Sequence, residues 1–571
     1  MATIIKKKVR NNTYYYLVES ARVNGKPRIV KQTYLGTAEK IEEAVRQMTC
    51  EKTIAEAKEV TVYEFGAVAA LYSVAQRLGV GEIIDAIAGK RKQGLPVSAY
   101  MVLAAVNRAA SPTSKAGFHE WFERTALRGI YPGANAKNLS SQGFWNNMAE
   151  LDEEKIRLIE DAVTARVVER YGIETQSLLF DNTNFYTYID TSNPSTLAKR
   201  GHCKQKRTDL KIVGLSLMVS PDHNIPLFHE AYPGNRHDAQ QFSAVVGKLK
   251  ERWRKLGKGE CSVTLVFDKG NNNEDNIAEL IGSEPCPFHF VGGLRLSQCP
   301  ELLDVSIWNY EPLNGDFRGT SAYRATVYIY ERNFTAVVTY NPELFEAQMD
   351  GVLANIASCQ KALSELKEKL RLRREGIVTK GKNPTADSTT KNVLGILSDE
   401  HMRLIFDYNV TGDPGETPEL SFSLNDDRFA QLQERSLGKS IIFTDHDDWP
   451  NERILLAYRS QFHVEDAFRQ MKDTKYLSFR PVRHFTDSQI RVHAFYCVLA
   501  LTLASLLNKE LDLMGHDLSV HRMLDLFQSA QQVVSIFASP DGKPVPKISY
   551  SRLDGLVMDY VSKYHLLSYF S

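Results

Sequence analysis

The chain has 571 residues, of which 43% are hydrophobic and 24% charged, the balance of a globular protein with about three to five domains. Its formal net charge is only +1, which excludes a chain that is basic throughout, so any DNA contact must come from local basic patches. Seven cysteines without a Cys-x-x-Cys pair argue against a disulfide framework and a zinc ribbon, and they favour a reducing compartment.

The N-terminal region divides into two parts that differ in the spacing of their apolar residues. Alternating segments on both sides of Asn24 and Gly25 predict a β-hairpin, so we interpret residues 1–57 as a small β unit. No apolar run follows the first charged residues, so we expect no signal peptide and a cytoplasmic protein. Residues 58–174 show apolar side chains at helical spacing and are interpreted as a helical domain, a candidate for DNA binding.

Residues 175–300 carry apolar runs bounded by turn residues. Their order is three strands, a helix, a fourth strand and another helix, which predicts an α/β layer with a mixed sheet flanked by helices. Residues 301–435 interrupt this order of strands and helices with a hairpin and a helix from about Pro342 to Arg374. We therefore expect an inserted mixed α/β lobe.

The α/β texture resumes over residues 436–508, with the strand SIIFTD and a helix from about Asn451 to Lys472. The apolar stretch at residues 494–507 is shorter than the ~20 residues of a membrane span, so we interpret it as a buried core helix. Residues 509–571 are interpreted as a helical tail, and we expect no membrane partner.

Two aspartates close strands of the expected sheet. Asp181 ends the run LLFD and Asp268 ends the run LVFD, and turn-forming residues follow each of them. If these strands are neighbours in one sheet, both carboxylates emerge at the same end, where two divalent cations about 3.5–4 Å apart would find oxygen ligands. Each Asp taken alone is more often only a turn residue.

A third carboxylate stands on the helix that contains AYRSQFHVEDAFRQMK. Tyr458, Gln461, Glu465 and Lys472 recur at helical spacing and share one face, which would present a metal-binding carboxylate between phosphate-seeking groups. The alternative is a solvated face on which Glu465 and Arg469 form an i,i+4 pair that contributes about 0.2–0.5 kcal/mol.

Together these motifs resemble the DDE transposases of bacterial insertion sequences, in particular the insertion-sequence-4-like superfamily and its 1634-type branch. Further similar stretches are KRTDLKIVGLSL, PLFHEAYPGNRHD, SLGKSIIFTD and FRPVRHFTDSQIRVHAFYCVLALTL. The resemblance implies an RNase H-like core formed by residues 175–300 and 436–508. An insertion between these two parts separates the third carboxylate from the first two in the sequence. The separations fit, because Asp268 follows Asp181 by 87 positions and Glu465 follows Asp268 by 197 positions.

The resemblance also implies the site. Asp181, Asp268 and Glu465 would be the catalytic residues and would hold two Mg²⁺ or Mn²⁺ ions. The family signature on the Glu helix is matched by Tyr458 and Lys472, whereas Gln461 stands where the family has Arg, and Arg459 lies two positions earlier. That departure puts the handling of the cleaved end, including any hairpin step, in doubt.

Several basic and aromatic residues are further candidates for DNA contact. The loop LAKRGHCKQKRTDLK concentrates basic residues between two predicted strands, and a second group follows the Glu helix. Trp449, before that helix, is either a base-stacking wedge or a hydrophobic anchor for the helix. The basic candidates are Lys204, Lys206, Arg207, Arg480 and Arg483.

Other ligand motifs are weak. Residues His202, Cys203, His223, His229 and His237 show no recurring zinc-ligand spacing, and a Gly-rich phosphate loop of the GxxxxGK type is absent, so no nucleotide is expected. The resemblance implies a cut-and-paste transposase that binds double-stranded DNA, namely its element's terminal inverted repeats and a target, and dimerises in the synaptic complex. The alternatives are a host nuclease on the same fold and a catalytically inactive DNA-binding relic.

Overall fold

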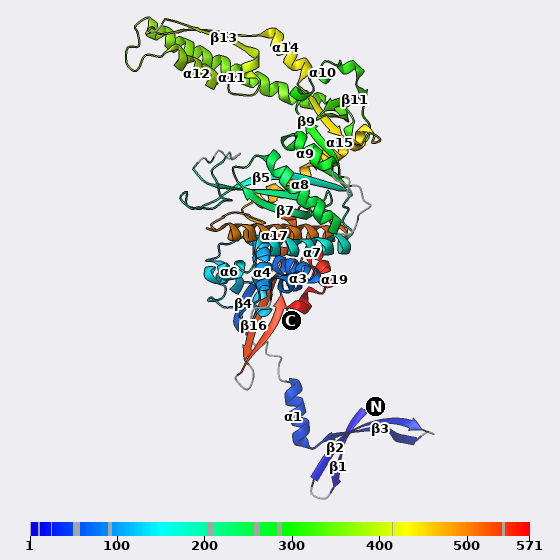
Figure 1. The fold of residues 1–571 in the computed structure, drawn as a ribbon. Coiled ribbons are helices and arrows are strands. Elements are labelled where there is room, and N and C mark those ends of the chain that lie inside the picture. Colours follow the sequence, from blue (N-terminus) through cyan, green and yellow to red (C-terminus); the bar gives the residue numbers. More distant parts are fainter. Residues whose placement is uncertain are drawn as a thin grey trace. The chain divides into compact units, whose positions relative to one another are not determined.

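The structure, a computed structural model, describes residues 2–9, 12–23, 26–49, 57–89, 94–201, 207, 209–255, 263–282, 288–413, 415–538 and 543–570 (Figure 1). The chain forms two compact units. The first comprises Met1–Tyr63 and Gln531–Arg552, and the second comprises Glu64–Ala530 and Leu553–Ser571.

The first unit is built from two small antiparallel sheets. β1 (Ala2–Val9), β2 (Asn12–Val23) and β3 (Lys26–Gly36) form one sheet, and the pairing of β2 with β3 confirms the predicted hairpin. α1 (Ala38–Thr49) follows. The second sheet has the order β17-β16-β4 and joins β4 (Ala57–Glu64) to β16 (Gln531–Ala538) and β17 (Pro544–Tyr550).

The expectation of a wholly helical tail is therefore wrong over β16 and β17. The segment QQVVSIFA is rich in β-branched and aromatic side chains, which favour a strand, and it pairs with β17 as an antiparallel hairpin. The flanking parts of the tail are helical, as α18 (Val520–Gln528) and α19 (Gly555–Lys563).

A nine-stranded mixed sheet forms the centre of the second unit. Its order is β10-β11-β12-β15-β9-β8-β5-β6-β7. β8 runs parallel to both β5 and β9, and the remaining neighbours pair antiparallel. The strands are β5 (Ser177–Tyr186), β6 (Ile212–Val219), β7 (Pro226–Pro233), β8 (Val263–Phe267), β9 (Phe288–Leu294), β10 (Glu311–Pro312), β11 (Ser321–Ile329), β12 (Arg332–Tyr340) and β15 (Lys439–Thr444).

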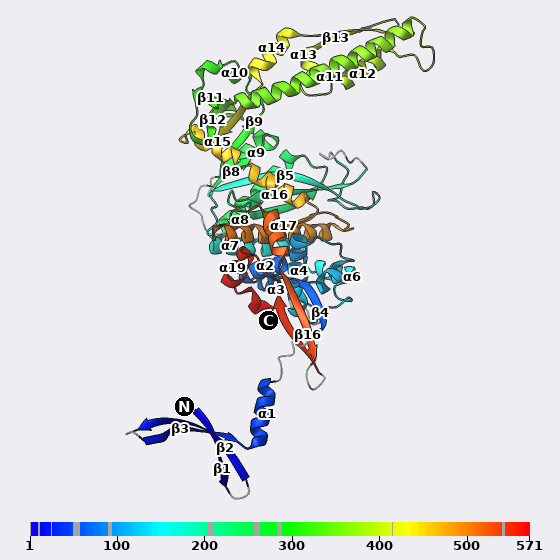
Figure 2. The same ribbon diagram turned by 180° about the vertical axis from the view of Figure 1, so that it is seen from behind.

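Helices cover both faces of this sheet. α8 (Asp238–Lys255) and α9 (Glu274–Ile281) lie on one face, where Phe242 of α8 contacts Phe180 and Phe267. α15 (Asn451–Arg459) packs against β8, β9 and β15, and α16 (Phe462–Lys472) packs against β5 and β6 (Figure 2). The single helix predicted from Asn451 to Lys472 is thus two helices, which separate at Ser460 and Gln461.

A helical layer packs around α17 (Asp487–Asp512), which also contacts β7 (Figure 1). In the described part of the chain, α17 and the bent pair α2–α3 have the length and composition to cross a membrane, and 94% of the most apolar window of α17 is buried. That burial is what a core helix requires. The other helices of this region are α2 (Gly66–Arg77), α3 (Val80–Ala88), α4 (Val97–Ala110), α5 (Phe118–Glu123), α6 (Ser141–Met148) and α7 (Glu153–Tyr171).

The region expected as an inserted lobe, residues 301–435, divides in two. β10, β11 and β12 extend the large sheet, because β15 pairs with β9 on one side and with β12 on the other. The remainder has a separate core that includes Val352, Leu363, Val393 and Leu420. Its elements are α11 (Pro342–Arg374), α12 (Ala386–Ile396), α13 (Met402–Ile405), β13 (Phe406–Thr411), β14 (Glu419–Leu424) and α14 (Asp426–Arg435), and α10 (Pro300–Leu303) precedes it.

Candidate functional site

Asp181 and Asp268 lie side by side on neighbouring strands. Asp268 directly follows β8, but Asp181 lies inside β5, so the expectation that Asp181 ends its strand is wrong: the residues after it continue the antiparallel pairing with β6 instead of forming a turn. β5 and β8 pair in parallel register, with Leu179 opposite Val266 and Phe180 opposite Phe267. Asp181 and Asp268 are the next residues on the two strands, and both are partly buried. The register expected from the sequence is therefore present. Asp268 also accepts a hydrogen bond from the Lys269 backbone N–H at 2.7 Å, so it begins the turn that follows β8.

The alternation along β5 shows which face Asp181 occupies. Asn182 points toward the α8 face, where it donates to the Asn271 side chain at 3.2 Å and accepts from the Ser216 hydroxyl at 2.7 Å. Thr183 contacts α16 on the opposite face, through its hydroxyl. Because successive side chains of a strand alternate between faces, Asp181 lies on the α16 face with Thr183.

Tyr458 of α15 connects the helix to Asp268. Its hydroxyl donates to Oδ1 of Asp268 at 3.3 Å. Burial raises the pKa of Tyr458, and the negative charges of Asp268 and Glu465 raise it further, so the phenol stays protonated between two carboxylates. Gly293 of β9 makes room for this ring, because a Cβ at that position would lie 2.5 Å from the Tyr458 hydroxyl.

Glu465 lies in the first turn of α16 and is exposed. Gln461, which precedes that turn, is buried, with 7% of its surface exposed, and its amide donates to the Phe180 carbonyl at 3.5 Å. Gln461 therefore joins the start of the Glu helix to the residue before Asp181. This position differs from the direct phosphate contact expected for Gln461, because a buried amide that already contacts the backbone does not face solvent.

Lys472 ends α16 above β5. Its Nζ donates to the Thr183 hydroxyl at 2.7 Å and lies 5.8 Å from the centre of the Phe185 ring. Thr183 and Asp181 share a face of β5, so Lys472 lies on the same face as Asp181, two residues further along the strand. The ammonium is thus placed beyond the carboxylates on the side where the strand continues.

Basic side chains gather around two tyrosines at the end of β5. The Arg480 guanidinium contacts the Tyr186 hydroxyl, and it lies 4.6 Å from the centre of that ring. Arg483 lies 5.5 Å from the ring of Tyr188, and Arg207 lies 5.8 Å from that of Tyr186 while it forms an ion pair with Asp209. Lys204 and Lys206 lie outside the described residues.

Arg459 is exposed at the end of α15, where its Nη1 donates to the Asp316 carbonyl at 3.5 Å. Its guanidinium also lies 5.8 Å from the centre of the Phe317 ring. Arg459 therefore faces the segment before β11. It does not occupy the place beside β5 that Gln461 fills.

Trp449 is enclosed on both faces of its ring. The His446 ring stacks on it at 3.7 Å with an interplanar angle of 7°, and the Arg453 guanidinium lies 3.9 Å from its centre. Two groups this close must occupy opposite faces of the indole. Of the two roles weighed for Trp449, the geometry favours the anchor, because no ring face is open for a base.

A cleft of about 930 Å³ opens beside Tyr458 and Gly293. It runs toward α14 and the insertion core, and its walls carry a run of basic side chains that the sequence patterns did not single out. They lie at the ends of β8, β9 and β15 and on α14, segments that are distant in the sequence and meet only in the folded chain. They are Lys269, Arg295, Arg428, Arg435 and Lys439.

The donor set of Asp181, Asp268 and Glu465 consists of carboxylate oxygens, with the Tyr458 hydroxyl beside them. Hard divalent cations prefer such ligands. Among the described residues, one group of three histidine, cysteine or acidic side chains has all its ligand atoms within 4.8 Å of one another, and it consists of other residues. The ligand oxygens of Asp181, Asp268 and Glu465 are therefore spread more widely than that. Two ions about 3.5–4 Å apart require a wider frame than one ion does.

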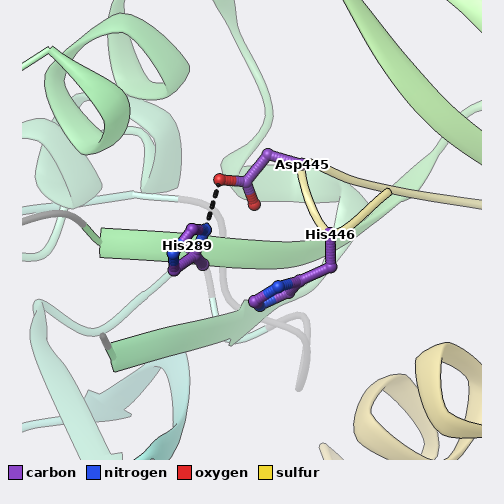
Figure 3. A group of neighbouring side chains, drawn as sticks. All are labelled: His289, Asp445 and His446. Carbon is purple, nitrogen blue, oxygen red and sulfur yellow. Dashed lines mark hydrogen bonds and ion pairs between the residues drawn. The ribbon is translucent and has the colours of Figure 1, made fainter. Parts of the chain in front are cut away.

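That different group lies at the amino ends of β8 and β9. His289 Nδ1 is 2.8 Å from Asp445 Oδ2 (Figure 3), and His446 Nε2 is 2.8 Å from the Thr264 hydroxyl. Burial lowers the pKa of His446 to about 4, although the nearby Asp445 opposes the shift. The sequence analysis considered other histidines for zinc: of these, His223 pairs with Asp222 and His229 with Glu160, and His202 and Cys203 lie outside the described residues.

No family model matches the chain, and no curated protein matches it. Two of the solved structures that match are transposases. The cryo-EM structure of a piggyBac transposase synaptic complex with hairpin DNA matches over 81% of this chain and 78% of that chain, at 8% identity and a TM-score of 0.37. The Mos1 transposase paired-end complex with its left transposon end matches over 34% of this chain and 59% of that chain, at 14% identity and a TM-score of 0.13.

Proposed function

We propose that this protein is a DNA transposase of the DDE type, with Asp181, Asp268 and Glu465 as its catalytic residues. The observation that carries the proposal is the placement of Asp181 and Asp268 side by side on parallel strands, with the Tyr458 hydroxyl bonded to Asp268 and Glu465 in the first turn of α16, the helix that packs on β5. The motif resemblance implies the same three residues.

The strand order supports the RNase H-like core of this proposal. Within the large sheet, β7-β6-β5-β8-β9 form an antiparallel meander of three strands followed by two parallel strands, and the two aspartates stand where the parallel strands meet the meander. The finer assignment, to the insertion-sequence-4-like superfamily and its 1634-type branch, rests on the sequence motifs.

Two Mg²⁺ or Mn²⁺ ions, when bound by these carboxylates, would activate the attacking oxygen and stabilise the leaving oxygen. Asp181 and Asp268 would hold both ions, and Glu465 would hold one from the exposed start of α16. Water would attack the phosphorus first and release a 3′-hydroxyl. That hydroxyl would then attack a target phosphorus, so one phosphodiester bond forms as another breaks.

The remaining residues would position DNA. Tyr458 stays protonated and orients Asp268, and Gln461 holds α16 against β5. Lys472, Arg480 and Arg483 would contact phosphates beyond the cleaved bond, and the basic walls of the cleft beside Tyr458 would follow the duplex on the other side. The partners would be the element's terminal inverted repeats and a target DNA, bound by a homodimer in the cytoplasm.

The test uses DNA fragments that immediately flank the gene, assayed with the purified protein for binding by gel shift and for cleavage in Mg²⁺. Asp181→Asn, Asp268→Asn and Glu465→Gln keep the side-chain shape and remove the charge. We expect each to abolish cleavage while binding stays within a few-fold of the unmodified protein. Full cleavage by any one variant would remove that residue from the triad.

The same assay separates the alternatives. Cleavage of any duplex without preference for the flanking repeats would indicate a nuclease on this fold. Specific binding without cleavage by the unmodified protein, in Mg²⁺ and in Mn²⁺, would indicate a DNA-binding relic.

A further inference from the structure

The second cluster on the sheet lies far from the aspartates. Thr264, which contacts His446, is four residues before Asp268 on β8 and on the same face. At about 3.3 Å per residue, the two clusters are separated by roughly 13 Å along the strand. His289, Asp445 and His446 are therefore not part of the proposed catalytic centre.

The three side chains come from segments that meet only in the folded sheet. His289 stands opposite Thr264 in the parallel register of β8 and β9, and Asp445 and His446 directly follow β15, which pairs antiparallel with β9. One ligand atom of each residue lies within 4.8 Å of those of the other two. The amino ends of two strands and the carboxyl end of a third thus bring two imidazoles and one carboxylate together.

Contacts with the backbone and with neighbouring rings fix this group. Asp445 Oδ1 accepts from the Phe290 N–H at 2.9 Å while Oδ2 faces His289, so the carboxylate is held from both sides. The His289 and His446 rings stack at 4.4 Å. His446 is buried, with 7% of its surface exposed, whereas His289 and Asp445 are partly exposed, which leaves a route from solvent.

We propose that His289, Asp445 and His446 form a binding site for one transition-metal ion of the Zn²⁺ type, separate from the catalytic carboxylates. Imidazole nitrogens and a carboxylate oxygen bind Zn²⁺ at about 2.0–2.2 Å, and three protein ligands with one water complete a tetrahedron. Ligand atoms around such an ion are about 3.4 Å apart, whereas those of the three residues lie within 4.8 Å of one another, so binding would draw them closer and turn the stacked imidazoles toward the ion. This donor set differs from the all-oxygen set that suits Mg²⁺.

The ion would tie three strands to the start of α15. His446 stacks on Trp449, which immediately precedes that helix, and Tyr458 at the far end of α15 bonds to Asp268. Bound metal would therefore stabilise the sheet and fix the helix that carries Tyr458. The site is structural in this proposal, so its ligands touch neither DNA nor the reacting phosphorus.

The test measures Zn²⁺ and Co²⁺ binding by the full-length chain after treatment with a chelator, by calorimetry and by the visible absorption of Co²⁺. We expect about one Zn²⁺ to bind to the unmodified protein with a dissociation constant in the micromolar range or below. The melting temperature should rise on addition of Zn²⁺, because a ligand that binds the folded state stabilises it. The Asp445→Asn and His446→Gln variants should each fail to bind this ion, and their melting temperatures should not rise on addition of Zn²⁺.

Two controls separate this site from others. Asp447→Asn alters a neighbouring carboxylate that accepts from the Thr335 hydroxyl, and it should retain the ion. A variant that combines Asp181→Asn, Asp268→Asn and Glu465→Gln should also retain it, so the result does not depend on the proposed catalysis. If Asp445→Asn fails to fold, His289→Gln, in the partly exposed position, provides the same comparison.

The proposal is overturned if the unmodified protein binds no Zn²⁺ beyond what these ligand variants bind. It is also overturned if the catalytic triple variant alone loses the ion. In either case the three side chains form only the hydrogen-bonded and stacked cluster that fixes Trp449.

Discussion

The two ends of β8 carry different side chains on the same face of one sheet. At the carboxyl end, Asp268 lies beside Asp181, the exposed Glu465 stands in the first turn of α16, which packs on β5, and the donors are oxygens. At the amino end, the buried His446 stacks between other rings, and the donors are mainly nitrogens. A strand end alone therefore does not define a site. Exposure and donor type distinguish an end that can admit a phosphate from one that supports the fold.

α15 spans the distance between these ends. It begins next to Trp449, which the His446 ring and the Arg453 guanidinium enclose, and Tyr458 near its end donates to Asp268. One end of the helix is thus fixed by packing, and the other end is available to orient a carboxylate. Substitutions at the two ends should consequently affect different measurements.

The largest contrast should come from two conservative Asp→Asn variants. Asp268→Asn should reduce DNA cleavage by at least about 1000-fold, because a neutral amide no longer binds a cation as a carboxylate does. Asp445→Asn, at the opposite end, should leave cleavage in Mg²⁺ within about tenfold of the unmodified protein. Single-turnover cleavage of the flanking DNA measures both. Equal losses would show that the two ends are not functionally distinct.

A smaller effect is expected at Tyr458. Tyr458→Phe removes the hydroxyl that donates to Asp268 and should slow cleavage about 10- to 100-fold, the range for a hydrogen bond to a charged group. Tyr476→Phe is the matched control, since its hydroxyl contacts Asp525 and Gln528 away from the aspartates. Should both variants cleave at the unmodified rate, Tyr458 would be only a packing residue beside Gly293.

Trp449→Ala tests the supporting end of α15. It removes a partly buried indole enclosed by His446 and Arg453, and the free energy of unfolding should fall by about 1–3 kcal/mol. Denaturant unfolding measures the change, and affinity for DNA should stay within about threefold. A large loss of DNA affinity at unchanged stability would instead assign Trp449 to base stacking.

The smallest effect is expected at Lys472. Lys472→Ala should weaken binding to the flanking DNA a few-fold and lower the slope of log affinity against log salt by roughly one phosphate contact. Lys475→Ala is the control, because Lys475 is paired with Asp525 at 2.5 Å. Identical salt slopes for both variants and the unmodified protein would move the expected DNA path to Arg480 and Arg483.

Local patterns predicted much of the sheet that holds Asp181 and Asp268. The run LVFD ends a buried strand, whereas the strand that contains LLFD continues past Asp181 to Tyr186. The helical spacing around Glu465 indicated the helix that packs on this strand. The sequence could not show that Ser460 and Gln461 separate two helices, since Gln461 continues the pattern of the helix face. Its burial against the Phe180 carbonyl depends on the packing of α16 on β5.

Features that depend on distant pairings were missed. β16 pairs with β4, which lies more than four hundred residues earlier in the chain, and the tail therefore contains strands where a helix was expected. The group of His289, Asp445 and His446 forms because β15 pairs with β9 across the insertion, and no spacing in the sequence reveals it. The one sequence signal for this group is that His446 and Trp449 stand close together in the short segment between a strand and a helix.

Anomalous diffraction from crystals of the protein bound to flanking DNA in Mn²⁺ tests directly whether Asp181, Asp268 and Glu465 hold the metal ions. We expect Mn²⁺ bound between the carboxylates of Asp181 and Asp268, with Glu465 on one ion and a DNA phosphate at the same position. Mn²⁺ found only beside His289, Asp445 and His446, or a scissile phosphate placed away from Asp181 and Asp268, would contradict the account.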